Sequence, residues 1–173
     1  MSDDVAEPRP GRDELVAVLY QRRTELVRLA YGLLGDRDGA EEVVQDAFAG
    51  LLSRWPSVRN IETAPGYLHA AVVNGVRGRW RRRRVRELAD KTLRRGLPAK
   101  EADVVERAVV LAAVGRLPMR KRACVLLRYY LDLSEVETAA VLDISVGTVK
   151  SQTSKALSQL AALLEPEHSE VNR

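Results

Sequence analysis

The sequence predicts an all-α protein of two small helical domains joined by a basic, flexible linker. Apolar residues recur every three to four positions in nearly every long segment, which is the spacing of a helix face, and no segment shows strand alternation. A chain of 173 residues has room for one average domain or two small ones. Hydrophobic residues make up 46% and charged residues 30%, which favours a folded chain over a disordered one.

The first two helices are separated by a Gly-Asp break. Apolar spacing predicts helical structure over residues 13–34. Asp38 is followed three positions later by Glu41, the arrangement of a capping box, so a second helix is expected to begin there. This helix is expected to continue to Trp55, because Pro56 cannot stay within it.

A third helix follows a loop at residues 56–66, and Pro65 suits its first turn because proline lacks the N–H that would be unpaired there. The helix has an apolar side at first and becomes almost wholly basic from Arg77. These three helices define a first domain over residues 12–84, after a disordered tail at residues 1–11.

Positive charge is concentrated in one segment. Residues 77–100 carry 11 basic and 2 acidic side chains, whereas the formal net charge of the whole chain is only +4. Helical spacing fades after Arg84, so residues 85–103 are expected to form the linker. Such a block favours a polyanion, for example a phosphate backbone, as partner. The alternative is a solvated basic helix end without a ligand.

A second domain is expected over residues 104–164, before a tail at residues 165–173. Its first helix is predicted at residues 104–117, with apolar positions at 105, 109, 112, 113 and 117, and its second at residues 119–131. One face of the second helix is expected to carry Val125, Leu126 and Tyr129.

The sharpest local pattern is a helix-turn-helix at residues 134–157. Ser134 and Glu137 have capping-box spacing at the start of its first helix, residues 142–145 suit the turn, and Ser145 can cap the second helix. Six side chains are expected to face inward from these two helices: Val136, Ala140, Val141, Val149, Ala156 and Leu160.

The second helix of this motif carries a polar face without a carboxylate. A helix that enters the major groove needs such a face, with small hydroxyls near phosphates, an amide for a base edge, and a cation. The alternative is a generic helical bundle in which these side chains are merely solvated. The candidate DNA-contacting residues are Thr148, Lys150, Ser151, Gln152 and Lys155.

Three segments in order resemble one known family. EEVVQDAF (41–48) resembles an acidic helix, and APGYLHAAVVNGVRGRWRRRR (64–84) is similar to a promoter-melting helix. Residues 117–157 look like a region four. The family is the extracytoplasmic-function (ECF) group of bacterial RNA polymerase sigma factors, in the sigma-70 superfamily, whose members retain only regions two and four. The abundance of arginine resembles actinobacterial members.

The resemblance implies that residues 12–84 are sigma region 2, for core polymerase and minus-ten binding. It implies that residues 104–164 are sigma region 4, for minus-thirty-five binding. The chain would be a cytoplasmic transcription initiation factor that directs core RNA polymerase to specific promoters and helps melt the minus-ten element. Its expected partners are core RNA polymerase, promoter DNA and an anti-sigma factor, with no membrane insertion and no small-molecule substrate.

The same resemblance implies roles for single residues. The residues that would dock on the clamp helices of the largest polymerase subunit are Glu41, Glu42, Gln45 and Asp46. A divalent-metal site and a plain solvated helix face are the alternatives for this acidic helix. Asn60 would lie in the loop that captures a flipped base of the minus-ten element. The residues that would hold the non-template strand are Asn74, Arg77, Arg79, Trp80, Arg81, Arg82, Arg83 and Arg84. Trp80 is expected either to stack on a base or ribose or to fold back on its helix.

Four positions depart from the family pattern. Tyr67 stands where Trp is frequent and Gly78 where Asp is frequent, so minus-ten recognition is expected to differ in detail. Asp143 replaces the usual glycine of the turn, and Asp tolerates the left-handed conformation at modest cost. Gln152 replaces a usual Arg, and Gln favours adenine.

Two other classes of function fit parts of the sequence. A stand-alone helix-turn-helix regulator explains residues 117–157, but it leaves the basic helix with Asn74 and Trp80 unexplained. A nucleic-acid enzyme is disfavoured, because His69 and His168 are isolated and no carboxylates accompany a phosphate loop.

No catalytic residue, cofactor or metal site is expected. Cys124 lies in an apolar run and is typical of a buried structural cysteine, and a single cysteine allows neither an internal disulfide nor a cysteine-cluster zinc site. No apolar run approaches the roughly 20 residues of a membrane helix. The opening MSDDVAEPRPGR lacks the pattern of a secretory signal.

Overall fold

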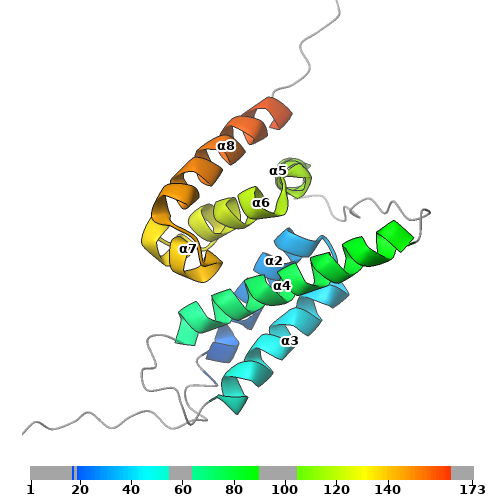
Figure 1. The fold of residues 1–173 in the computed structure, drawn as a ribbon, viewed down its shortest axis with the longest axis vertical. Helices are drawn as coiled ribbons and strands as arrows, with labels where there is room; N and C mark the ends of the chain where they lie inside the picture. Colours follow the sequence, from blue (N-terminus) through cyan, green and yellow to red (C-terminus); the bar gives the residue numbers. More distant parts are fainter. Residues whose placement is uncertain (1–16, 18, 55–63, 90–104, 165–173) are drawn as a thin grey trace, which may run out of the picture.

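The molecule consists of two groups of packed helices (Figure 1). The structure is a computed structural model, and it describes residue 17 and residues 19–54, 64–89 and 105–164. Every regular element in these residues is helical, which confirms the predicted all-α class. The N-terminal group contains α2 (Arg23–Leu34), α3 (Arg37–Ser53) and α4 (Ala64–Ala89). The C-terminal group contains α5 (Val105–Arg116), α6 (Met119–Val125), the π-helix η3 (Leu126–Tyr130), α7 (Glu135–Leu142) and α8 (Val146–Leu164).

The N-terminal group is held together by aliphatic side chains at helical spacing. Gly75 lets α4 approach α3 closely, since a Cβ at that position would lie 2.9 Å from Val43 Cγ1. Close contact of this kind supports dense packing between the helices. The largest fully buried members of this core are Leu26, Leu29, Leu33, Val44, Leu51, Leu68, Val72, Val73 and Val76.

The start of α3 differs from the prediction. Its N-cap is Asp36, and the Asp36 side chain makes no capping hydrogen bond. The predicted capping box of Asp38 and Glu41 is therefore wrong, because both residues lie inside the helix. Glu41 instead accepts a hydrogen bond of 3.4 Å from Arg37 Nε, one turn earlier. The helix ends at Ser53, and Trp55 with the predicted loop falls outside the described residues.

Helix α4 has Pro65 in its first turn, as predicted. It continues to Ala89, so the first residues of the predicted linker are helical. The rest of that linker, residues 90–104, lies outside the described residues.

In the C-terminal group, α5 occupies the predicted position but only part of its apolar surface is buried. Ala113, Val114 and Leu117 lie in the core, whereas Val109 and its neighbours face solvent. The sequence did not single out one face, because apolar residues occur all around this helix. The exposed apolar side chains are Val109, Val110 and Leu111.

The helix predicted at residues 119–131 changes its winding at Leu126. The Leu131 N–H donates to the Leu126 carbonyl at 3.1 Å, a π-helical hydrogen bond across five residues. Val125 and Leu126 are buried, whereas Tyr129 is 59% exposed. The prediction that Tyr129 shares their face is wrong, because the wider turn rotates the residues that follow it.

The helix-turn-helix is confirmed by its caps. Ser134 Oγ accepts from the Glu137 N–H at 3.1 Å, and the Glu137 carboxylate accepts from the Ser134 N–H at 2.7 Å. Asp143 ends α7 with φ 55° and ψ 53°, the left-handed conformation expected at the turn. Ser145 Oγ accepts from the Thr148 N–H at 3.1 Å and caps α8. Both helix starts were thus predictable from sequence.

A Ser134→Ala substitution is expected to lower the free energy of unfolding by about 1 kcal/mol, because it removes the acceptor for the Glu137 N–H. Urea denaturation followed by circular dichroism measures this change. Ser158 is the matched control, since its hydroxyl only donates to the Ser154 carbonyl one turn earlier on an exposed face. An equal loss in Ser158→Ala would contradict the role of the cap.

Of the three residues predicted for the inward face of α7, only Val141 is buried as expected. Val136 is 67% exposed and Ala140 also faces solvent, whereas Thr138 is fully buried. The error arose because the prediction admitted only apolar residues to the core, and Thr138 lies at the centre of the true face. The buried residues of α7 are Thr138, Ala139, Val141 and Leu142, while the predicted Val149, Ala156 and Leu160 of α8 are buried as expected.

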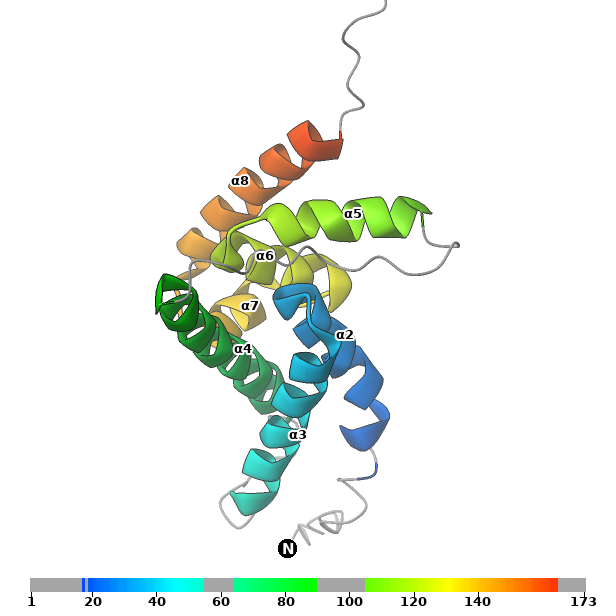
Figure 2. The ribbon, with the colours of Figure 1, turned by 90° about the vertical axis from the view of Figure 1, so that its right-hand side faces the viewer.

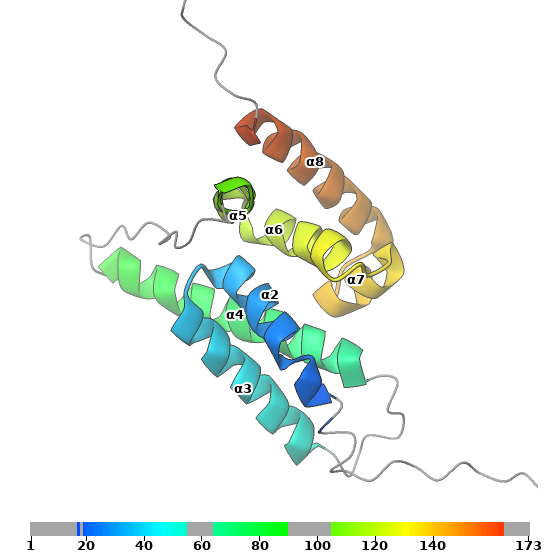
Figure 3. The same cartoon turned by 180° about the vertical axis from the view of Figure 1, so that it is seen from behind.

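The two groups pack against each other. Helix α4 contacts α7, and α2 contacts α5, α6 and η3; Figures 2 and 3 show this contact from the side and from behind. A Cβ on Gly32 of α2 would lie 3.0 Å from Leu126 Cδ1, so the backbone of one group touches the side chains of the other. Arg77 Nη2 donates to the Leu142 carbonyl at the end of α7, at 3.2 Å.

Arg122 is the most buried cation of this interface, with 7% of its surface exposed. Its Nη1 donates to the Leu33 carbonyl at 2.7 Å, and its Nη2 donates to the Leu117 carbonyl at 3.0 Å and to the Gly115 carbonyl. These carbonyls lie at the C-terminal ends of α2 and α5, where the helix dipoles place partial negative charge. Burial lowers the pKa of Arg122 from its ordinary value.

His69 of α4 is buried and is surrounded by charges from both groups. Burial lowers its pKa from the usual 6.5, Arg22 lowers it further, and the carboxylates of Glu25 and Glu137 oppose the shift. As the pH falls, His69 is therefore protonated at a higher pH in the unfolded chain than in the folded chain. The free energy of unfolding is expected to fall as the pH drops below about 6.5.

The measurement is urea denaturation between about pH 7.5 and 5.5, a range above the titration of ordinary carboxyls. His69→Gln should flatten the dependence, because the amide does not titrate. A slope that is unchanged in His69→Gln would assign the effect to other groups.

Candidate polymerase and DNA interface

The predicted polymerase-binding residues lie on the solvent side of α3. Glu42, Gln45 and Asp46 are exposed, and Glu41 is half-buried. Glu41 lies between two arginines, at 3.4 Å from Arg37 Nε and 3.8 Å from Arg23 Nη2. Among the ion pairs of the described residues none involves Asp46, so its carboxylate is available to a basic partner.

Glu42 connects this acidic face to the basic helix. Its carboxylate forms an ion pair with the Arg79 guanidinium of α4. One residue predicted to bind polymerase is thus paired with one predicted to bind DNA. The two lie 37 positions apart, and no local pattern in the sequence indicated the pair.

The side chains in the basic half of α4 differ in their exposure and in the contacts they make. Arg77 donates to the C-terminal group and Arg79 is held by Glu42. Asn74 is exposed, and Trp80 is 38% exposed, so the indole has not folded fully against its own helix. Arg81, Arg82 and Arg83 are also exposed, whereas the side chain of Arg84 and the whole of Asn60 lie outside the described residues.

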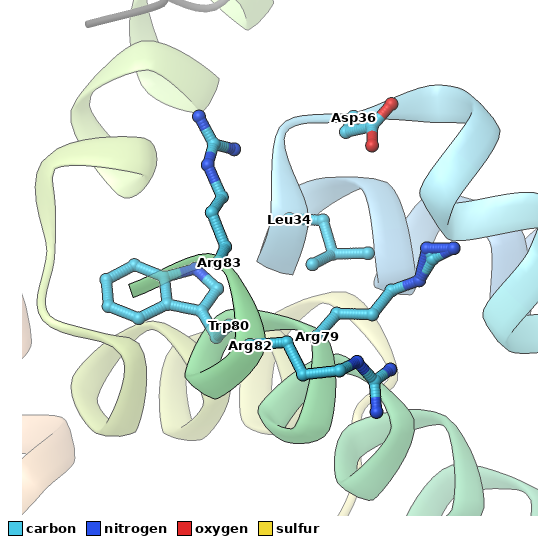
Figure 4. A pocket seen from close by; sticks show the side chains of 6 residues that line it. All are labelled: Leu34, Asp36, Arg79, Trp80, Arg82 and Arg83. Atoms are coloured by element: carbon cyan, nitrogen blue, oxygen red, sulfur yellow. The ribbon is translucent and has the colours of Figure 1, made fainter. Parts of the chain in front are cut away.

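A small open pocket lies where α4 passes the junction of α2 and α3 (Figure 4). Its volume is about 270 Å³. Leu34 and Asp36, from the junction, were not predicted as site residues, because only the fold brings them beside α4. The lining residues are Leu34, Asp36, Arg79, Trp80, Arg82 and Arg83.

Gly39 creates the space for two of these groups. A Cβ at Gly39 would lie 2.6 Å from Asp36 Oδ2 and 3.5 Å from Arg79 Nη1. Because a Cβ contact below 3.0 Å forces a shift, any larger residue at position 39 would displace the Asp36 carboxylate.

The predicted recognition helix, α8, presents its polar residues as expected, with Ser151 and Lys155 exposed and Gln152 half-buried. Thr148 Oγ1 lies 2.8 Å from Ser145 Oγ, so it is oriented by the cap. Lys150 forms an ion pair of 3.5 Å with Glu135 of α7. A carboxylate therefore borders the recognition helix, which the sequence of α8 alone did not indicate.

No group of three or more potential metal ligands occurs within the described ranges. Cys124 is fully buried, and burial raises the pKa of its thiol. No described helix is both long and apolar enough to cross a membrane.

Comparison with known proteins decides the family. The model of Sigma-70 region 2 matches residues 19–86, and the model of Sigma-70 region 4 matches residues 107–160. The chain is 32% identical over 156 residues to the RNA polymerase sigma-E factor of Streptomyces antibioticus, covering 88% of this chain and 85% of the relative. The chain belongs to the sigma-70 family of sigma factors. It is an ECF sigma factor, a transcription initiation factor, and the region 2 match disfavours a stand-alone regulator.

Other relatives support the same group. The ECF RNA polymerase sigma factor EcfG of Rhodopseudomonas palustris is 31% identical to this chain over 159 residues. The match covers 88% of this chain and 84% of EcfG. The fold resembles the solved sigma factor RpoE of Bartonella quintana, in complex with the anti-sigma factor NepR, with TM-score 0.74 and 22% identity. That likeness covers 88% of this chain and 97% of RpoE. The fold also resembles CnrH in complex with the cytosolic domain of CnrY, with TM-score 0.69 and 21% identity over 91% of each chain.

Proposed function

We propose that this sigma factor binds core RNA polymerase through the exposed acidic face of α3 and holds promoter DNA with α4 and α8. The observation that carries the proposal is the placement of that acidic face directly beside the basic half of α4. A basic partner and a polyanion can then bind adjacent surfaces of the N-terminal group without competing for the same charges. In these terms residues 12–84 serve as region 2 and residues 104–164 as region 4.

The residues of α4 have two roles in this proposal. Trp80 and Asn74 meet the non-template strand of the minus-ten element. Arg77 and Arg79 contribute after they leave their intramolecular partners, and Asn60 takes the flipped base. The exposed arginines that contact phosphates are Arg81, Arg82 and Arg83, together with Arg84.

Helix α8 reads the minus-thirty-five element in the major groove. Gln152 supplies an amide that can pair with adenine, while Thr148, Ser151 and the two lysines Lys150 and Lys155 contact the phosphates. The exposed, carboxylate-free side of α8 supports this assignment.

An anti-sigma factor is a further proposed partner, since the solved sigma factor RpoE, which shares the fold, was captured in complex with the anti-sigma factor NepR. We also infer that the protein acts in the bacterial cytoplasm, with polymerase, and that it catalyses no reaction itself. The support for this is its family, whose members are transcription initiation factors.

The proposal is tested by mixing the purified chain with bacterial core RNA polymerase and fragmented DNA from the source organism. Start sites of the transcripts are then mapped. We expect co-elution with core and transcripts from a shared two-part promoter. Promoter binding should weaken steeply between about 50 and 200 mM salt, because each neutralised phosphate releases a counterion. Failure to bind core, with duplex binding by the chain alone, would instead support a stand-alone regulator.

A Gln152→Ala substitution is expected to weaken binding to the mapped minus-thirty-five element by about 1–3 kcal/mol, and to relax the preference at one base pair. Lys155→Ala is the comparison, because loss of a phosphate contact weakens binding to all sequences alike. Competition with promoters that carry single base changes measures the difference. A uniform loss in both variants would remove Gln152 from base recognition.

A further inference from the structure

A carboxylate from the first helix of the helix-turn-helix lies against the recognition helix. Glu135 Oε2 of α7 is 3.5 Å from Lys150 Nζ of α8, and 38% and 63% of the two side chains are exposed. Helix α8 has no acidic residue of its own between Val146 and Leu164. In the free chain, the charge of Lys150 is therefore balanced by a residue of the neighbouring helix.

Both residues of this ion pair are attached to backbone that is held in place. Glu135 is in the first turn of α7, which the capping box of Ser134 and Glu137 fixes, and the helix dipole favours a carboxylate there. Lys150 follows Val149, whose burial fixes the rotation of α8. Only the two side chains have to be ordered for the pair to form, which reduces the entropy that opposes it.

The ion pair competes with DNA for the same ammonium. A lysine ammonium is a compact charge that binds phosphates of any sequence. A phosphate that approaches Lys150 has to displace the Glu135 carboxylate, which also repels it. Ser151 and Gln152, the neighbouring polar residues of α8, are uncharged and take no part in this competition. The ion pair therefore weakens phosphate binding by Lys150 and leaves the amide and hydroxyl groups beside it unaffected.

We propose that Glu135 is a positioning residue that restrains Lys150 and thereby lowers the affinity of α8 for duplex DNA of any sequence. Binding then depends more on side chains that discriminate between bases than on attraction to phosphates. Non-promoter DNA is held almost entirely by phosphate contacts, so it loses this contribution without any base contact to replace it. The inference rests on the proposed function of α8 and adds to it a residue outside the recognition helix.

The direct test is the binding of the full chain to a fluorescein-labelled random-sequence duplex of about 20 base pairs, measured by fluorescence anisotropy between about 50 and 200 mM NaCl. Glu135→Gln removes the ion pair but keeps the length of the side chain. At the lowest salt concentration we expect this variant to bind about three- to fivefold more tightly than the unaltered chain, the limit set by an exposed ion pair. The slope of log K against log salt should become steeper by about 0.9, because Lys150 then neutralises one more phosphate. Unchanged affinity and slope would overturn the inference.

Asp132→Asn is the matched control, because it removes the same negative charge from the same group of helices. Asp132 is exposed and lies outside the ion pairs of the described residues, and asparagine tolerates its left-handed conformation, φ 52°. This control should tighten binding by less than about twofold, since salt screens a charge without a partner near DNA. In a Lys150→Ala background, Glu135→Gln should have no larger effect than the control. The full gain in that background would show that charge alone is responsible and would refute the role of the ion pair.

Lys155→Ala shows whether a failure belongs to this inference or to the proposed function. If α8 binds DNA, this variant should weaken binding to the random duplex independently of Glu135. A loss in Lys155→Ala together with no gain in Glu135→Gln would reject the inference and leave the proposed function of α8 in place. No effect of either substitution would contradict DNA binding by α8, and the inference would fail with it. Circular dichroism should show unchanged helix content in Glu135→Gln, because Ser134 and Glu137 supply the cap.

Discussion

An Asp46→Arg substitution is expected to abolish stable association with core RNA polymerase. Asp46 is exposed on α3 and lies outside the ion pairs of the described residues, so it contributes nothing visible to the fold. A basic partner surface would meet arginine where it requires a carboxylate, and such a like-charge contact costs several kcal/mol. We expect an affinity loss of about a hundredfold or more. Gel filtration of each variant with core polymerase measures it.

Asp38→Arg is the matched control, because it makes the same change of net charge on the same helix. Position 38 is also exposed but lies eight residues away, about 12 Å along the axis. Co-elution of Asp38→Arg but not of Asp46→Arg would locate the contact at the middle of α3. Equal loss in both would indicate a response to net charge, and co-elution of both would remove Asp46 from the interface. Circular dichroism should show unchanged helix content in each.

An Arg122→Met substitution is expected to lower the free energy of unfolding by about 3–5 kcal/mol. The guanidinium donates to the Leu33 carbonyl of the N-terminal group and to the Gly115 and Leu117 carbonyls of the C-terminal group. It therefore joins the ends of two helices that belong to different groups. Methionine fills much of the volume but donates nothing, so the Leu33, Gly115 and Leu117 carbonyls are left unpaired in a buried site. Urea denaturation followed by circular dichroism measures the change.

Arg120→Met is the control for charge on α6, because Arg120 is exposed and should change stability by less than about 0.5 kcal/mol. Arg122→Lys is the sharper comparison. Lysine keeps the charge but presents a single compact ammonium, which cannot reach carbonyls on two sides of the site. Full stability in Arg122→Lys would show that charge alone is sufficient and would contradict the argument from geometry.

Local structure was largely predictable because it depends on neighbours in the chain. Ser134 and Ser145 have the residue types and spacing of N-caps, and the turn between the helices needs a residue that accepts the left-handed conformation, which Asp143 does. The predicted cap at Asp38 was wrong because residue type and spacing, which located the other caps, fit two positions here. Asp36, two positions earlier, has an equally suitable side chain, and local sequence did not distinguish between them.

The faces of the short helices were harder to predict, because a face is decided by what packs against it. Thr138 is polar and yet fully buried, and Val136 is apolar and yet mostly exposed. Tyr129 does not lie on its predicted face because the helix winds as a π-helix from Leu126 to Tyr130. The residue types in this segment do not indicate that change of winding. Hydrophobic spacing located each helix but did not fix its rotation in these cases.

Contacts between distant residues were beyond reach of the sequence. Arg79 was assigned to the DNA-binding surface and Glu42 to the polymerase-binding surface. The two residues form an ion pair although they lie 37 positions apart in the sequence. Arg77 meets Leu142 across 65 positions, and Arg122 meets Leu33 across 89. Only the fold shows that these groups lie together. The candidate DNA site therefore includes residues, such as Leu34 and Asp36, that the sequence did not indicate.

The ion pair between Glu42 and Arg79 makes the two proposed binding events thermodynamically linked. If polymerase engages Glu42, Arg79 is released toward DNA, and if DNA engages Arg79, Glu42 is released toward polymerase. By reciprocity, the factor by which either ligand strengthens the other must be the same in both directions. An exposed pair of this kind contributes at most about 1 kcal/mol, which limits that factor to about fivefold. The Glu42–Arg79 ion pair would then favour the complex of the sigma factor with both polymerase and DNA over its complex with either one alone.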